Sequence, residues 1–461
     1  MNNFFTELKD SIFGVEQDYT KIRLRKAIVL LSIPMVLEML FESLFAILDI
    51  YFVSQLGDNA TAVVGLTESL MTLVYAIGIG IAMGTTGLVS RRIGEKNPEK
   101  ASRGASQAIL LSLFLSLFIA IPGFFAAEKI LGLMKASPEV IEQGRNYTRL
   151  MMTGNILIML LFVNNAIFRS AGNPALSMWV LIIANLVNIV LDPCFIFGLG
   201  PFPELGVTGA AVATNTGRGL AVLIQFYLMF KGKGRIKLRL SYFRLQIKTM
   251  WKVLYLSGGG IFQFLIATSS WIFLYRILSS YQEEVIAGYT IGIRIFVFFL
   301  LPAWGLSNAA STLVGQNLGA KNPERAQKAV WITALVNACY MLLIMLLFQF
   351  IPHILISAFG TSEVSYDVAI RCLKIISLGN LFYGVQMVIG QAFNGAGDTY
   401  TPTLLNFIGF WLIEIPLAAL LALKLGMEEN GVFYSIFIAE SVLCIISVYV
   451  FTRGKWKLRE I

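Results

Sequence analysis

The chain has 461 residues, of which 57% are hydrophobic and only 14% are charged, and its formal net charge is +9. A soluble chain would carry about 25% charged residues, so this composition excludes an ordinary soluble globular protein. The chain also lacks the alternating short strands that are typical of a transmembrane β-barrel. Its charges lie in short loops between apolar runs such as 108–127 and 334–356. Each run is near or above the ~20 residues that cross a bilayer as a helix.

The first 26 residues are polar and of mixed charge, without the apolar core of a signal peptide. Residues 4–14 have the pattern of a short amphipathic helix. We expect 1–26 to be a cytoplasmic N-terminal segment.

Apolar runs then recur along the whole chain, and we interpret them as transmembrane helices of an all-α integral membrane protein. Twelve spans are predicted: 27–53, 60–89, 104–127, 144–167, 174–199, 207–230, 250–280, 286–314, 328–350, 367–393, 402–425 and 431–452.

The distribution of basic residues predicts the orientation. Lys and Arg gather before the first span, after the second, sixth and eighth spans, and at the end of the chain. If the spans alternate, all these segments lie on one side. The loops after the first, fifth and seventh spans carry Asp or Glu but no Lys or Arg. By the positive-inside rule, both termini of this multi-pass protein are cytoplasmic. The positive charge therefore reflects topology and lipid contact, and we expect no nucleic-acid partner.

An internal repeat divides the chain. "LVSRRIGEKNPEKA" (88–101) matches "LVGQNLGAKNPERA" (313–326) at an offset of 225 residues. The chain therefore reads as two six-helix bundles in the same orientation, 27–230 and 250–452. A basic cytoplasmic linker (231–249) joins them, and 453–461 forms a cytoplasmic tail. Parallel repeats of this kind suit a transporter with a central site between two lobes.

The fifth span contains an unusual carboxylate. Asn188 and Asp192 lie four residues apart, so their side chains share a helix face. Pro193 follows and frees a backbone carbonyl one turn earlier. A carboxylate in a bilayer core costs roughly 2.5–3.5 kcal/mol, which bound Na⁺ would offset, because hard cations prefer oxygen ligands. The same carboxylate can instead take up a proton. A third interpretation is an Asp that caps a kinked helix end.

The first span carries an acidic stripe. Glu38, Glu42 and Asp49 are spaced by four and seven residues and so lie on one face. Such a face is costly unless it lines water or cations. The stripe predicts a negative cavity for a lipophilic cation, with cation–π contacts from Phe45 and a further carboxylate from Glu68. The alternative is that these carboxylates pair separately, for instance with Arg169 or Arg218.

The second half has no charge at the repeat positions of Asp49 and Asp192, so the repeat is symmetric in fold and asymmetric in charge. We expect Arg294 and Glu414 to form a structural ion pair. An intramembrane enzyme would need a nucleophile–base or metal constellation, and the single histidine, His353, excludes a His-Glu-x-x-His site. We therefore predict no catalytic residues. A channel is disfavoured because no filter-like loop is present.

Three segments carry a resemblance to a known family: "IPMVLEMLFESLFAILDIYFVSQLGDNATAVVGL" (33–66), "GLVSRRIGEKNPEKA" (87–101) and "NLVNIVLDPCFIFGLGPFPELGVTGAAVAT" (185–214). With the twelve spans, they resemble the multidrug and toxic compound extrusion (MATE) transporters, most closely the prokaryotic DinF-like branch. The resemblance covers about residues 20–452. It implies a two-lobed V shape and a place in the inner membrane of a prokaryote. It also implies export of cationic or amphipathic compounds, coupled to inward flow of Na⁺ or H⁺. We expect a monomer with no cofactor besides the coupling ion. The alternative is a flippase for lipid-linked oligosaccharides, which would favour a positively charged cavity.

The resemblance also implies roles for residues. It implies that the family's cation site corresponds here to Asp49, Asn165, Asn188, Asp192 and Thr214, with Thr216 as the alternative to Thr214. Na⁺, if bound, would contact Asp49, Asn188 and Asp192. Tyr147 matches a tyrosine near the site, and Pro34, like Pro193, is expected to bend its helix. Phe45 stands where some members have a hydrogen-bonding tyrosine.

Overall fold

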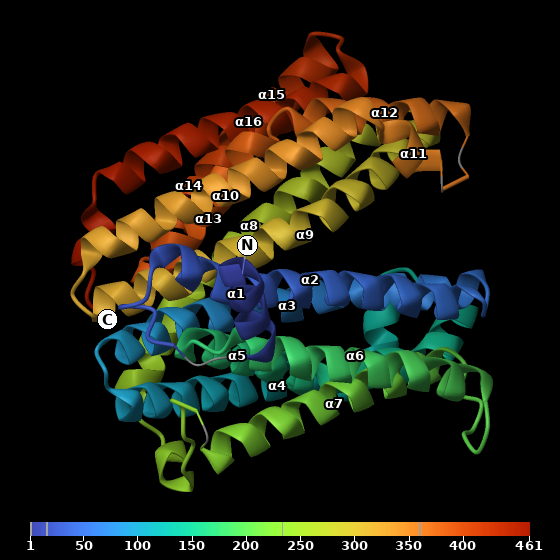
Figure 1. The fold of residues 1–461 in the computed structure, drawn as a ribbon. Helices are drawn as coiled ribbons and strands as arrows, with labels where there is room; N and C mark the ends of the chain where they lie inside the picture. The colour runs from blue at the N-terminus through green and yellow to red at the C-terminus, as the bar shows by residue number, and fades with distance from the viewer. Residues whose placement is uncertain (1, 15–16, 233, 358, 361) are drawn as a thin grey trace.

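The computed structural model describes residues 2–14, 17–232, 234–357, 359–360 and 362–461. Residues 1, 15 and 16 of the predicted N-terminal segment, and residue 233 of the predicted linker, lie outside this part of the chain. All regular elements within the described ranges are helices, which confirms the all-α prediction. They form two bundles, the N-lobe and the C-lobe (Figure 1).

The N-lobe contains six long helices, preceded by the short helix α1 (Asn2–Phe13). Its long helices are α2 (Leu24–Ser54), α3 (Asp58–Gly94), α4 (Pro98–Leu133), α5 (Pro138–Ala171), α6 (Pro174–Phe197) and α7 (Val207–Lys231). The α1 helix lies against the lobe, because Lys26 pairs with Asp10 at 3.3 Å and the Trp179 indole donates to the Ile12 carbonyl at 2.7 Å.

The C-lobe repeats this order with more interruptions. A single turn, η1 (Leu240–Phe243), precedes it. Its elements are α8 (Ile247–Leu278), α9 (Glu283–Gly319), α10 (Pro323–Phe350), α11 (Pro352–Ser357), α12 (Glu363–Ser377), α13 (Asn380–Ala396), α14 (Tyr400–Asn406), the π-helical η2 (Phe407–Glu414), α15 (Ile415–Ala419), the π-helical η3 (Leu420–Lys424) and α16 (Glu428–Thr452). The turn η4 (Lys455–Leu458) lies in the tail.

These helices account for the predicted spans. Within the described residues, ten helical segments are long and apolar enough to cross a membrane, and the pair α12–α13, bent by 58°, supplies an eleventh. The remaining predicted span corresponds to α7, which is less apolar because Asn215, Thr216 and Arg218 interrupt it. The predicted single span 367–393 is thus a broken helix.

The two lobes meet at one end and diverge toward the other, as the two arms of a V (Figure 1). The turns of the internal repeat lie where they meet, which we name the converging end. In both turns an asparagine caps the next helix: Asn97 accepts from the Lys100 amide at 3.0 Å, and Asn322 from the Arg325 amide at 3.1 Å. Equivalent sequence therefore forms equivalent local structure in the two lobes.

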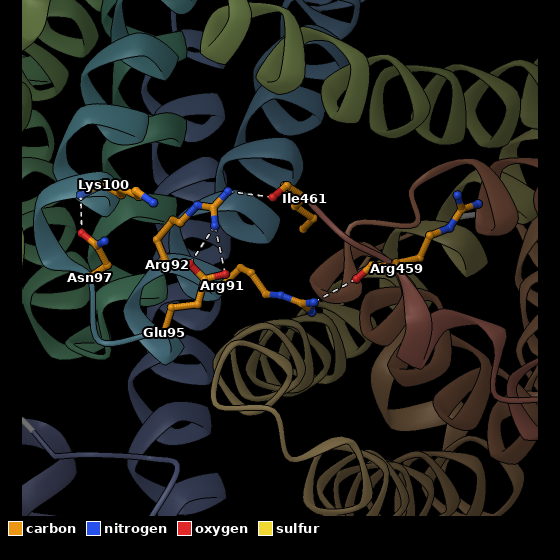
Figure 2. A network of polar contacts seen from close by, with 7 residues as sticks. All are labelled: Arg91, Arg92, Glu95, Asn97, Lys100, Arg459 and Ile461. Carbon is orange, nitrogen blue, oxygen red and sulfur yellow. Dashed lines mark hydrogen bonds and ion pairs between the residues drawn. The ribbon is translucent and has the colours of Figure 1, made fainter.

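The tail of the chain joins the lobes at the converging end (Figure 2). The Arg91 guanidinium donates to the Arg459 carbonyl at 2.9 Å, and Arg92 donates to the Ile461 carbonyl at 2.6 Å. The Arg459 side chain in turn pairs with Asp398 of the C-lobe at 3.2 Å. Since Arg91 and Arg92 belong to α3 of the N-lobe, the tail bridges both lobes.

Candidate functional site

Asp192 is buried inside the N-lobe with no partner for its charge. Its exposed fraction is 0%, and neither carboxylate oxygen makes a hydrogen bond in the described structure. The α6 helix continues through Pro193, so Asn188 lies one turn earlier on the same face. A buried, unpaired carboxylate is costly unless a proton or a cation neutralises it.

Asn188 connects α6 to α7. Its Nδ2 donates to the Thr214 hydroxyl at 3.2 Å, and its Oδ1 is buried without a partner. Thr216 is exposed and donates to the carbonyl of Val212 in its own helix. Of the two threonines considered, Thr214 is therefore the one that lies beside Asn188.

Asp49 of α2 lies close enough to Asp192 for their negative charges to repel. Its Oδ1 is also buried without a partner. Tyr147 of α5 is 3% exposed and lies within electrostatic reach of Asp49. Three helices thus bring two carboxylates, an amide oxygen and a hydroxyl into one region, an all-oxygen set that suits a hard cation.

Asn165 is engaged elsewhere. Its Nδ2 donates to Glu38 at 3.2 Å, and its Oδ1 accepts from Gln225 at 2.6 Å. The structure therefore places Asn165 between the N-lobe interior and the central cavity, rather than in contact with Asn188.

The central cavity lies between the lobes and has a volume of about 290 Å³. From the N-lobe, Glu38, Glu42, Tyr75, Phe162, Asn165, Arg169 and Arg218 are among its lining residues. From the C-lobe, Leu301, Trp304, Asn308, Ser311, Thr312 and Gln391 line it. Of the predicted cavity residues, Phe45, Glu68 and Tyr147 are outside this lining as far as the structure describes it.

The charges of the cavity are balanced. Glu38 pairs with Arg169 at 3.0 Å, and Glu38 is 1% exposed. Arg218 lies within electrostatic reach of Glu42 and Glu68. Two carboxylates and two guanidinium groups therefore face the cavity. The acidic stripe is better described by the alternative interpretation, in which its carboxylates pair with Arg169 or Arg218, than by a purely negative surface.

The C-lobe wall of the cavity was not predicted. Asn308, Ser311 and Thr312 lie three and four residues apart on α9, so they share one face. A polar stripe within an apolar helix was the available signal. The predicted cavity rests on charged and aromatic residues of the N-lobe, so it does not include this stripe.

Comparisons with known proteins agree with the two-lobed fold. The family model described as MatE matches residues 34–194 and again 260–420, one match in each lobe. A probable multidrug resistance protein NorM of Thermotoga maritima is 26% identical over 441 residues, covering 95% of this chain and 94% of the relative.

Two solved structures share the fold. One is the outward-facing conformation of a multidrug resistance MATE family transporter of the MOP superfamily, with a TM-score of 0.89, 25% identity, and coverage of 96% of this chain and 98% of the other. The second, a MOP superfamily transporter from Pyrococcus furiosus, has the same TM-score, identity and coverage, and its binding pocket is described as having reverse polarity. Both neighbours are transporters.

Proposed function

The chain belongs to the MatE family of multidrug transporters, and we propose that it exports cationic or amphipathic organic compounds across the cytoplasmic membrane in exchange for Na⁺ or H⁺. The observation that carries the coupling is Asp192, fully buried and without a partner beside Asn188 and Asp49. The central cavity, lined by both lobes, is the proposed cargo site.

The proposed transport cycle uses the V shape. By the positive-inside rule the converging end is cytoplasmic, so the described structure corresponds to a state open to the outside. In this state the coupling ion enters the N-lobe and cargo leaves. Return to the inward-open state requires the lobes to separate at the converging end and to close at the other.

The ion acts by changing charge between two helices. Asp49 on α2 and Asp192 on α6 repel each other when both are ionised. A bound Na⁺ or proton removes that repulsion and favours a closer approach of α2 to α6. Because α2 also carries Glu38 and Glu42 of the cargo cavity, ion binding alters the cavity wall. The ion can drive export only through such a difference in affinity between two states.

The alternative cargo is an amphipathic lipid-linked compound with an anionic headgroup. The observation that favours it is the pair of guanidinium groups, Arg169 and Arg218, in the cavity lining. Arg169 is already paired with Glu38, which leaves Arg218 as the group such a headgroup would contact first.

Transport in proteoliposomes tests the proposal. Purified protein should export cationic dyes under an imposed Na⁺ or H⁺ gradient, and Asp192→Asn should abolish gradient-driven export. Glu204→Gln, which changes an exposed loop carboxylate, is the matched control and should transport normally. Gradient-driven export by Asp192→Asn at the control rate would reject Asp192 as the coupling site. Export of anionic amphiphiles in preference to cationic dyes would favour the alternative cargo.

A further inference from the structure

The linker between the two lobes is held against α4 by one buried side chain. Gln107 of α4 is 0% exposed, and its Nε2 donates to the carbonyls of Tyr242 and Arg244 at 3.0 Å and 2.9 Å. Its Oε1 accepts from the Gln246 amide at 2.9 Å. Both polar atoms of the Gln107 side chain therefore bond to the linker backbone, which fixes the side of the linker that faces outward.

The outward side of the linker is basic. Its exposed basic side chains are Arg239, Arg244, Lys248 and Lys252. None of them pairs with a carboxylate in the described part of the chain, and the sequence has no acidic residue between Glu204 and Glu283. The carboxylate of Glu99 on neighbouring α4 is already paired at 2.7 Å with Arg103, whose guanidinium lies over the Tyr242 ring of the linker. The positive charge of this surface is thus uncompensated.

Large apolar side chains are exposed beside these basic groups. They are Leu240, Leu245, Ile247 and Trp251, with exposed fractions of 81%, 70%, 81% and 64%. Each one is next in sequence to one of the four basic residues. We name these eight exposed side chains the linker face. A surface that alternates apolar and basic groups in this way is typical of an element that lies in the headgroup region of a membrane.

The linker face continues the lipid-facing side of α8. Trp251, Tyr255 and Phe262 lie four and seven residues apart, so they share one side of this helix, and each is more than half exposed. Toward the N-lobe, the Phe243 ring of the linker stacks on Phe230 of α7 with 6.2 Å between the ring centroids. The linker therefore lies where two transmembrane helices leave the bilayer, the level at which tryptophan is enriched.

We propose that the linker face binds anionic phospholipid of the cytoplasmic leaflet. Its basic groups contact the lipid phosphates, and its apolar side chains insert among the acyl chains just below them. Charge complementarity favours anionic over zwitterionic headgroups, because the latter carry no net charge. The other basic segments at this end differ, since Glu95, Glu99 and Glu324 are interspersed among their Lys and Arg residues. Lipid binding at the linker face is independent of the cargo and of the coupling ion.

Native mass spectrometry tests the proposal. Full-length protein in detergent is titrated with phosphatidylglycerol or with phosphatidylcholine of the same acyl chains, and the lipids bound per chain are counted. Each basic group near a membrane surface contributes about fivefold in affinity for anionic lipid. Wild type should bind phosphatidylglycerol at least about tenfold more tightly than phosphatidylcholine, and Arg239→Gln/Arg244→Gln/Lys248→Gln/Lys252→Gln should lose this preference. Equal binding of both lipids by wild type, or an unchanged preference in the quadruple variant, would overturn the proposal.

A matched variant controls for net charge. Arg25→Gln/Lys100→Gln/Lys328→Gln/Lys455→Gln removes the same charge from four exposed residues of α2, α4, α10 and the tail. It should keep the preference for phosphatidylglycerol. An equal loss in the two quadruple variants would show that overall charge attracts the lipid, and the linker face would then be no specific site. The unfolding temperature in detergent checks that every variant is folded.

Two further measurements distinguish a phospholipid from a free phosphate. Leu240→Ser/Leu245→Ser keeps all four basic groups and should weaken phosphatidylglycerol binding about tenfold, because the two side chains no longer insert among the acyl chains. Inorganic phosphate in excess should not displace the lipid from wild type. Full binding by the serine variant, or displacement by phosphate, would assign the surface to phosphate groups in general and reject phospholipid as its partner.

Discussion

Gly94 and Gly319 hold equivalent places in the two repeats, and each packs directly against the other lobe. A Cβ atom on Gly94 would lie 2.0 Å from the Gln316 carbonyl oxygen, and one on Gly319 would lie 2.2 Å from the Arg91 carbonyl oxygen. Arg91 and Gln316 are themselves repeat equivalents, at the same offset of 225 residues. The contact is therefore a pseudo-twofold one, in which α3 and α9 touch backbone to backbone at the converging end (Figure 1).

Gly94→Ala should open the converging end. The added methyl group meets backbone rather than a movable side chain, so the lobes must separate, at a cost of roughly 1–3 kcal/mol to the closed arrangement. Spin labels on the two lobes near this end should report longer distances by double electron–electron resonance. Gly65→Ala is the control in the same helix, because a methyl group added there would have no neighbouring atom within 4 Å. Unchanged distances in Gly94→Ala would mean that this contact does not hold the end closed.

Loss of the tail contacts should also separate the lobes at the converging end, but less than Gly94→Ala does. Arg91→Ala/Arg92→Ala removes the two hydrogen bonds to the tail carbonyls shown in Figure 2. Hydrogen bonds from charged groups contribute about 1.5–3 kcal/mol each to stability when they are buried. The contribution of Arg92 is smaller, because its guanidinium also pairs with Glu95 at the surface. The lobes should separate more often, which limited proteolysis of the tail would detect as faster cleavage.

Arg103→Ala is the control for the tail experiment. Arg103 pairs with Glu99 within the exposed first turns of α4. Its removal should leave the proteolysis rate unchanged. Equal cleavage of all three proteins would show that the tail is held by its apolar contacts instead.

Glu38→Gln should destabilise the N-lobe by leaving Arg169 unpaired. Removing one partner of a buried ion pair costs roughly 3–5 kcal/mol, whereas replacing both partners costs less. The double variant Glu38→Gln/Arg169→Gln should therefore recover part of the loss in unfolding temperature. If the two single losses simply add in the double variant, the 3.0 Å contact does not couple them.

The twelve spans and the repeat could be predicted because bilayer-length apolar runs and basic loops are properties of the sequence alone. The sequence does not predict the break between α12 and α13, because Leu378 and Gly379 continue an apolar run and only the bend of the backbone separates the two helices. The balance of charge in the cavity depends on the ion pair between Arg169 of α5 and Glu38 of α2. Residue spacing within one helix cannot predict a contact between two helices.

The buried carboxylate of Glu414 shows a related limit of prediction from sequence. Its predicted ion pair with Arg294 is wrong, because Arg294 is exposed and the two side chains make no ion pair in the described part of the chain. The repeat offset of 225 residues places Leu417 opposite Asp192, which predicts no charge at that position of the second lobe. Glu414 lies three residues before Leu417, at the end of a π-helical stretch that changes the number of residues per turn. A comparison by residue offset assumes constant helical register, so it cannot detect a carboxylate that a π-helix turns into the lobe.

Thr214→Val should weaken the proposed N-lobe cation site without changing any charge. The Thr214 hydroxyl accepts from Asn188 Nδ2 at 3.2 Å and so fixes which end of the amide is held against α7. Without this acceptor the amide is free to rotate, and its unpartnered Oδ1 is no longer held for the cation. A lost neutral hydrogen bond of about 1 kcal/mol predicts a decrease in Na⁺ affinity of about fivefold, or an equal change in proton affinity if H⁺ is the coupling ion.

Thr214→Ser keeps the hydroxyl and should restore the affinity. Thr216→Val alters the exposed threonine two residues away and should have no effect. A loss in Thr214→Ser as large as that in Thr214→Val would contradict this account, because serine keeps the hydroxyl that accepts from Asn188.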